Sequence, residues 1–305
     1  MAVDDRRRLC AFVGDFAPEV PLAIRLKQAL VLLGLQVAAF WPVWRWQAAR
    51  VTDSSDDAWG WVALLTAILM VIRFKNEANN HTPKLWLPAL LTFVYAFSFP
   101  FLTPLPRAIL AMIALGATLS ICFFRSTFQL SIGGLLLLSL PVMASLQFYL
   151  GFPLRATVAA IAAPLLQLGG LVVVREGTCL NWNGLAVSVD APCSGIKMLW
   201  TGMYLTFTLA GLFRLNARRT AAAAMLAFVA ILLGNILRAV ALFYLEAGIV
   251  NLPERFSGAA HSAVGVMMFL LTALTIGWLV ARLKTENPTR LDLCEPFSSS
   301  LSAAR

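Results

Sequence analysis

Three reactive side chains lie in the second half of the 305-residue chain, within Ala-Pro-Cys-Ser-Gly, Gly-Asn-Ile-Leu-Arg and His-Ser-Ala-Val-Gly. They are Cys193, Arg238 and His261, and each lies near the edge of an apolar segment. A thiolate is a nucleophile, an imidazole accepts a thiol's proton, and a guanidinium stabilises developing negative charge. Together the three residue types predict a cysteine-nucleophile site.

Cys193 is predicted to lie at the start of a helix. Pro192 disfavours helix before it, and Ser194 is suited to cap the free amides of the first turn. The partial positive charge at a helix N-terminus stabilises a thiolate. Two alternatives stay open: Cys193 is merely a small hydrophobic residue, or it forms a disulfide with Cys179 in an oxidising compartment.

Arg238 and His261 are unusual in their surroundings. Arg238 lies inside an apolar segment, where a charge is costly unless it reaches the interface or meets partners. Asn235, three residues earlier, shares its helical face. His261 opens the last apolar segment and titrates near neutrality, which suits a proton acceptor. The alternatives are an arginine that only snorkels and a histidine without a function.

The composition is that of a polytopic membrane protein. The chain is 60% hydrophobic and 13% charged, with a mean hydropathy of +0.79, which exceeds what a soluble core of this length could hide. Its net charge of +9 is spread over short gaps between apolar segments, so we predict contact with the lipid bilayer and none with nucleic acid. Five scattered cysteines and two histidines predict no metal site, and we predict no cofactor.

Nine apolar segments approach the roughly 17 to 25 residues that a spanning helix needs. The bias of Lys and Arg toward cytoplasmic loops places both chain ends inside, and this requires one segment not to cross. Pro164 and the pair Gly169–Gly170 interrupt the segment at 156–174, so we predict two short helical pieces there at the outer interface, with an ordinary ninth span as the alternative. The nine segments lie at about 28–46, 59–74, 85–102, 107–124, 128–150, 156–174, 196–213, 221–245 and 262–281.

The predicted fold is therefore an all-α polytopic membrane protein with about eight transmembrane helices and both ends in the cytoplasm. The first segment is expected to be a retained span and not a cleaved signal peptide. Residues 175–192 predict a small external β-hairpin with a tight turn at Asn183–Gly184. Residues 1–284 form one integral membrane domain, in which 155–192 are the external interfacial helix plus hairpin, and 285–305 form a polar, disordered cytoplasmic tail.

The three motifs resemble those of the exosortase and archaeosortase family of integral membrane cysteine transpeptidases. The resemblance rests on Ala191–Gly195, Asn235–Arg238 and His261–Gly265, and extends over roughly 28–281. It implies a nucleophile at Cys193, a base or acid at His261 and an electrostatic stabiliser at Arg238. Asn235 and Ser194 are expected to be supporting residues.

The same resemblance implies a substrate and a location. The substrates would be secreted proteins with a C-terminal sorting signal, which consists of a short motif of the Pro-Glu-Pro kind, a transmembrane helix and a basic tail. The enzyme would lie in the cytoplasmic (inner) membrane with its site facing the periplasm or exterior, and would pass an acyl group through a thioester to an acceptor. A purely hydrolytic intramembrane cysteine protease is the nearer alternative and a transporter the more distant one.

Overall fold

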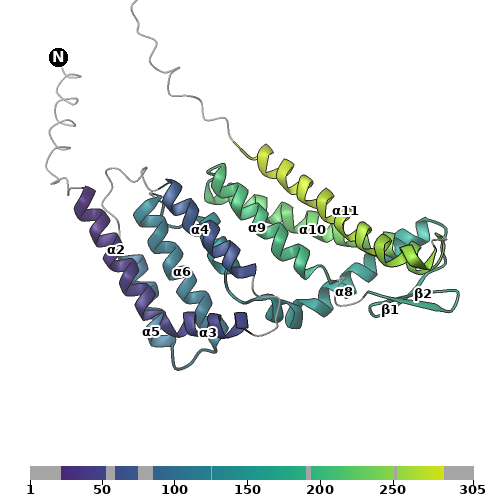
Figure 1. Ribbon diagram of the computed structural model, residues 1–305, viewed down its shortest axis with the longest axis horizontal. Coiled ribbons are helices and arrows are strands. Elements are labelled where there is room, and N and C mark those ends of the chain that lie inside the picture. The colour runs from purple at the N-terminus through teal and green to yellow at the C-terminus, as the bar shows by residue number, and fades with distance from the viewer. Residues whose placement is uncertain are drawn as a thin grey trace, which may run out of the picture.

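The computed structural model describes residues 22–52, 59–74, 85–124, 126–189, 194–250 and 253–284. Within these ranges the chain is helical apart from one small antiparallel sheet (Figure 1). The helices are α2 (Leu22–Ala39), α3 (Trp41–Thr52), α4 (Gly60–Phe74), α5 (Trp86–Ser98), α6 (Pro104–Phe123), α7 (Leu130–Leu138), α8 (Met143–Leu168), α9 (Ile196–Leu212), α10 (Ala217–Glu246) and α11 (Glu254–Arg282). The strands are β1 (Val174–Glu176), β2 (Cys179–Trp182) and β3 (Leu185–Ser188).

The length and composition of the helices confirm a multi-pass membrane protein. Among the described residues, α6, α8, α10 and α11 are each long and apolar enough to cross a membrane. Shorter apolar helices are α4, α5 and the Leu30–Ala39 part of α2. The total of eight spans and the cytoplasmic placement of both ends remain predictions.

The first predicted span, 28–46, is wrong as a single helix. Helix α2 ends at Ala39, and α3 starts at Trp41 and turns away from it (Figure 1). Pro42 is the second residue of α3 and favours a helix start there, because a proline lacks the amide hydrogen that the first turn does not need. Phe40 anchors the corner, since it is fully buried with its ring 4.7 Å from that of Tyr95.

The expected break within 156–174 is also wrong, because the break lies earlier in the chain. Helix α7 ends at Leu138 ahead of Pro141, and α8 then continues for 26 residues through Pro153 and Pro164. Prolines are tolerated inside membrane helices where neighbours satisfy the freed backbone groups. Helix α8 stops only at Gly169–Gly170, so the predicted boundary at residue 155 falls within it.

The predicted hairpin is confirmed and has one more strand than expected. Strands β2 and β3 pair antiparallel across Asn183–Gly184, whose φ angles of 49° and 83° are those of a type I′ turn. Strand β1 pairs antiparallel with the other edge of β2. The sheet packs against α8, and Gln167 of α8 donates a hydrogen bond to the carbonyl oxygen of Val173 at 2.8 Å.

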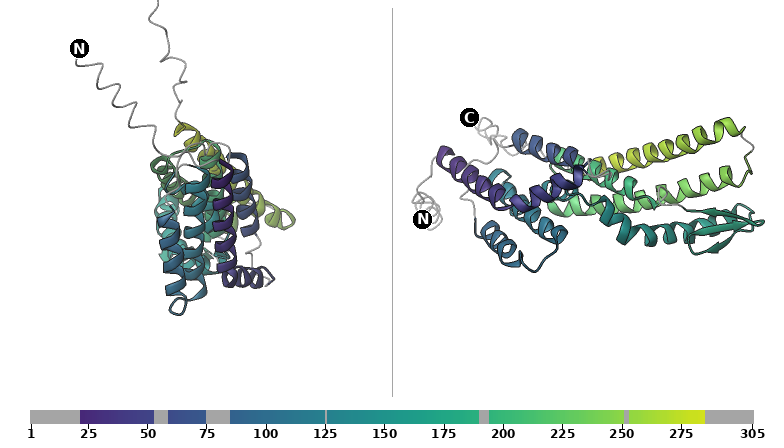
Figure 2. Two further views of the ribbon diagram at one scale, coloured as in Figure 1. Left: turned by 90° about the vertical axis from the view of Figure 1, so that its left-hand side faces the viewer. Right: turned by 60° about the horizontal axis from the view of Figure 1, so that its bottom comes forward.

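Two apolar clusters meet along α10. The inner cluster joins α9, α10 and α11 and includes Ile231 of α10. The outer cluster joins the second half of α8, the strands and the last turns of α10, and includes Ile236. Helices α8, α10 and α11 therefore extend together toward the sheet, as Figure 2 shows on its right. Asn235 and Arg238 lie where the two clusters meet.

Candidate active site

The turn that follows the predicted nucleophile is fixed to α8. Cys193 itself, with residues 190–192, lies outside the described residues. Ser194 comes next and is buried, and its hydroxyl donates a hydrogen bond to Oε1 of Gln147 at 3.1 Å. The amide of Ile196 reaches the same hydroxyl at 3.5 Å, but Gly195 is the N-cap residue of α9 and no side chain caps the helix there, so the predicted cap by Ser194 is wrong. Ser194 thus ties the start of α9 to α8.

Gly195 gives this turn its shape and brings it against α10. Its φ of 78° belongs to the left-handed region, which a residue with a Cβ rarely adopts. A Cβ at this position would also lie 2.8 Å from Cγ and Nδ2 of Asn235, closer than the atoms could pack. The glycine therefore permits both the sharp entry into α9 and the close approach of the buried Asn235 side chain. This contact differs from the predicted role of Asn235 as a partner of Arg238 on the same helical face, and that role stays a prediction.

Arg238 lies one turn further along α10 and points across to α11. A Cβ built on Gly265 would be 3.7 Å from both Nε and Nη2 of Arg238, so the guanidinium lies against the bare backbone of that glycine. Among the residues that the structure describes, the buried Nε atom donates no hydrogen bond and the guanidinium forms no ion pair. A half-buried cation of this kind is suited to binding an anionic group.

His261 lies one helical turn before Gly265 on the same face of α11. Its Nδ1 is 3.4 Å from Oε1 of Glu246, and both side chains are about two-fifths exposed. A carboxylate on one ring nitrogen favours a proton there and leaves the other nitrogen as an acceptor. The ring is therefore held where the C-terminal end of α10 lies beside the N-terminal part of α11.

The structure brings Arg238 and His261 to the same junction of α10 and α11, and Asn235 and Ser194 to the turn after Cys193. In the described part of the chain, no hydrogen bond or ion pair joins Arg238 to His261 directly. The guanidinium lies deeper and the imidazole one turn further out. Cys179 is a free, half-buried thiol on β2, so the disulfide alternative is not seen.

Two site residues were missed from the sequence, Gln147 and Glu246. Gln147 precedes Ser194 by 47 positions, and no local pattern announces their contact. Glu246 had a detectable signal, because it is an acidic residue in the last turn of the apolar helix that carries Arg238. An acid at that end faces α11, which begins at Glu254, seven residues before His261 and earlier than the predicted last span at 262–281.

Comparison with known families decides the identity. A family model described as transmembrane exosortase matches residues 25–278, which is most of the chain. The protein belongs to the transmembrane exosortase family. Membership implies a membrane protein-processing enzyme of the peptidase or transpeptidase kind, in agreement with the predicted resemblance. No curated protein and no solved structure matched the chain.

Proposed function

We propose that this exosortase cleaves secreted proteins at a C-terminal sorting signal through a thioester on Cys193 and transfers the acyl group to an acceptor. Family membership supports the reaction class. The observation that supports the site most directly is the position of the Arg238 guanidinium. It lies against Gly265, which is one helical turn from His261 on α11. On α10, Arg238 is three residues from Asn235, which contacts Gly195.

The proposed reaction has two halves. His261 accepts the proton of Cys193, and the thiolate attacks the scissile carbonyl carbon. The resulting oxyanion is stabilised by Arg238, and its collapse breaks the peptide bond while His261 returns the proton to the leaving amine. An acceptor amine then attacks the thioester, forms the new amide and releases the Cys193 thiol.

Glu246 has a supporting part in this proposal. Its contact with Nδ1 of His261 leaves Nε2 as the nitrogen that exchanges the proton. A carboxylate in this position also stabilises the imidazolium that forms during the attack. Glu246 therefore acts through His261 and does not touch the reacting atoms.

The proposed substrates carry a Pro-Glu-Pro-like motif, a transmembrane helix and a basic tail, and the proposed location is the cytoplasmic membrane with the site on its outer face. The outer placement rests on the distribution of Lys and Arg in the loops. It also agrees with a sheet, an exposed imidazole and an exposed carboxylate gathered at one end of the molecule.

The nearest rival is a protease that uses water as the acceptor. It would need the same three residues, so only the fate of the thioester separates the two reactions. A transporter would place its polar residues near the middle of the membrane, between repeated halves. Here the polar residues gather at one end of α10 and α11, which favours an enzyme.

The experiment uses a reporter, defined as a secreted host protein that ends in a Pro-Glu-Pro motif, an apolar helix and a basic tail. The purified enzyme is incubated with the reporter, quenched in acid and digested for mass spectrometry. We expect a hydroxylamine-sensitive adduct between the new reporter C-terminus and the peptide that contains Cys193. An enzyme that cleaves the reporter without this adduct contradicts the thioester. A mature reporter with a free carboxylate favours hydrolysis, and one joined to an acceptor favours transpeptidation.

A further inference from the structure

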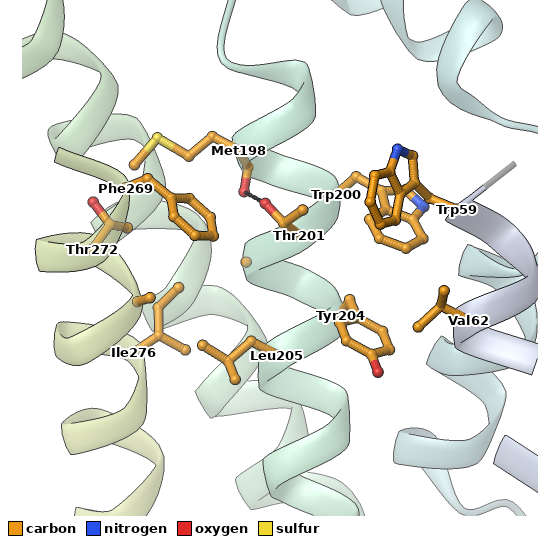
Figure 3. Close-up of a pocket in the computed structure, with 12 residues that line it drawn as sticks. Trp59, Val62, Met198, Trp200, Thr201, Tyr204, Leu205, Phe269, Thr272 and Ile276 are labelled. Atoms are coloured by element: carbon orange, nitrogen blue, oxygen red, sulfur yellow. Dashed lines mark hydrogen bonds between the residues drawn. The ribbon is translucent and has the colours of Figure 1, made fainter. Parts of the chain in front are cut away.

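A second feature of the structure is an apolar groove below the candidate site. It has a volume of about 390 Å³ and lies between α4 and α11, with α9 as its floor. Figure 3 shows Phe269, Thr272 and Ile276 of α11 on one side and Trp59 and Val62 on the other. This volume falls within the range of ligand-binding pockets.

The groove offers an occupant apolar surface and few hydrogen bonds. Trp200 donates its indole N–H to the carbonyl oxygen of Leu138, and the Tyr204 hydroxyl pairs with that of Thr66 at 2.9 Å. The hydroxyls of Thr201 and Thr272 donate to carbonyl oxygens one turn back in their own helices. An extended peptide would leave its backbone groups unsatisfied here, whereas a helix satisfies its own.

The groove lies one to two helical turns from the candidate site along two helices, and no site residue is among its lining residues. On α9 it extends from Met198 to Leu205, which is roughly 3 to 14 Å below the first residue of the helix at 1.5 Å per residue. On α11 its wall begins at Phe269, one turn below Gly265 and two turns below His261. An occupant of the groove would therefore present its outer end at Arg238 and at the turn that follows Cys193.

We propose that this groove holds the transmembrane helix of the substrate and so sets which peptide bond reaches Cys193. The assignment rests on the proposed function. It names the surface that recognises the substrate's helix, an apolar cleft with Trp200 and Tyr204 on its α9 floor and with Trp59 and Phe269 on its walls. The cleavage site then lies a fixed distance outside the first apolar residue of the bound helix.

The direct test compares two neighbouring positions on α11. Ala273 lines the groove, whereas Leu274 is 70% exposed and does not line it. The photo-crosslinker benzoylphenylalanine is placed at either position in the full-length Cys193→Ala protein, and the reporter is co-expressed. We expect at least about tenfold more adduct with the reporter's helix from position 273, because adjacent helical residues face directions about 100° apart. Equal yields, or adducts from position 273 to lipid or to a second copy of the enzyme only, overturn the assignment.

A second measurement uses the intact nucleophile. The variant Ala273→Trp fills the groove and is expected to slow reporter processing about tenfold, whereas Leu274→Trp stays within about twofold of the wild type. Alkylation of Cys193 by a small reagent is expected to be the same in both. If the wild type processes the reporter and Ala273→Trp is equally fast, the groove assignment is wrong and the proposed function is unaffected. If the wild type leaves the reporter intact, the groove assignment and the proposed function are both wrong.

Discussion

At the scale of single residues, Arg238 is the clearest conflict between stability and function in the chain. A half-buried guanidinium in an apolar helix with a buried, unbonded Nε costs stability. Neither α10 nor α11 needs a cation at this place for packing, since Gly265 only leaves room for it. In the proposed function, the negative charge that develops on the substrate offsets this cost.

Replacement of Arg238 by Met is therefore expected to separate the two roles. The unfolding temperature in detergent should be unchanged or higher, because a buried cation is removed, while reporter processing should fall about 10²- to 10³-fold. Arg255→Lys, at an exposed position in the first turn of α11, is the control and should change neither quantity. A processing rate for Arg238→Met near that of the wild type would contradict the oxyanion role.

Glu246→Gln tests how His261 is positioned. The neutral amide keeps the shape of the side chain but no longer stabilises an imidazolium, so we expect reporter processing to slow about tenfold. This is less than in a buried triad because both partners are partly exposed. Glu246→Asp should restore part of the rate. Glu176→Gln on β1, the matched acid away from His261, should leave the rate unchanged, and an equal loss there would show that Glu246 acts only through surface charge.

The residue types of the site could be predicted from sequence because cysteine, arginine and histidine are rare in apolar segments and each lies in a motif of its own. The side chains that contact the site residues could not be predicted. Gln147 and Glu246 meet Ser194 and His261 only because α8 and α10 pass close to the starts of α9 and α11. Such contacts depend on helix packing that no local pattern contains.

At the scale of elements, the turn that enters α9 is held between two helices. Ser194 is bonded to α8, and Gly195 lies against Asn235 of α10. The start of α9 is therefore coupled to both helices through these two residues. A change in this turn is expected to affect stability and catalysis together.

Gly195→Ala measures that coupling, with Gly170→Ala as its control. Both glycines have a left-handed φ, of 78° and 86°, but only Gly195 has atoms within 4 Å of an added Cβ. The strain of a Cβ at a left-handed φ should lower the free energy of unfolding by about 1 kcal/mol in each variant. The contact with Asn235 should add about 1 to 3 kcal/mol at position 195 alone. Equal losses, measured by chemical unfolding in detergent, would show that Asn235 does not constrain the turn.

The elements that sequence patterns predicted best were those with strong local signals. The Asn183–Gly184 turn was correct because two residues with positive φ leave few alternatives. Helix borders were less predictable. Pro42 and Pro141 ended helices inside apolar segments, whereas Pro153 and Pro164 did not interrupt α8. Whether a proline breaks a membrane helix depends on its neighbours in space, which apolar periodicity does not reveal.

At the scale of the whole molecule, the proposed function places the sheet on the outer side of the membrane, together with the ends of α8, α10 and α11 that lie near it. The α9–α10 connection then lies on the cytoplasmic side. The two ends of the 30-residue helix α10 are about 45 Å apart at 1.5 Å per residue, more than the thickness of the hydrocarbon core. The predicted topology assigns the Glu246 end to the outside and the Asn216 end to the cytoplasm.

Cysteine labelling tests this topology in a background in which the five native cysteines are replaced by Ala. A membrane-impermeant thiol reagent applied to intact cells with a permeabilised outer layer should modify Arg175→Cys, on the exposed strand β1. It should modify Arg218→Cys, at the exposed start of α10, only after the membrane is opened. The reverse pattern would place the site in the cytoplasm and contradict access to secreted proteins.

The central claim is that Cys193 is the nucleophile that processes secreted proteins. Its most direct test is the replacement of Cys193 by Ala in the host, followed by intact-mass analysis of secreted proteins that end in an apolar helix. The account predicts that every such protein keeps its C-terminal helix in the variant and loses it in the wild type, while Cys179→Ala, which removes the free thiol of β2, behaves as the wild type. Continued processing in the Cys193→Ala strain would contradict the account.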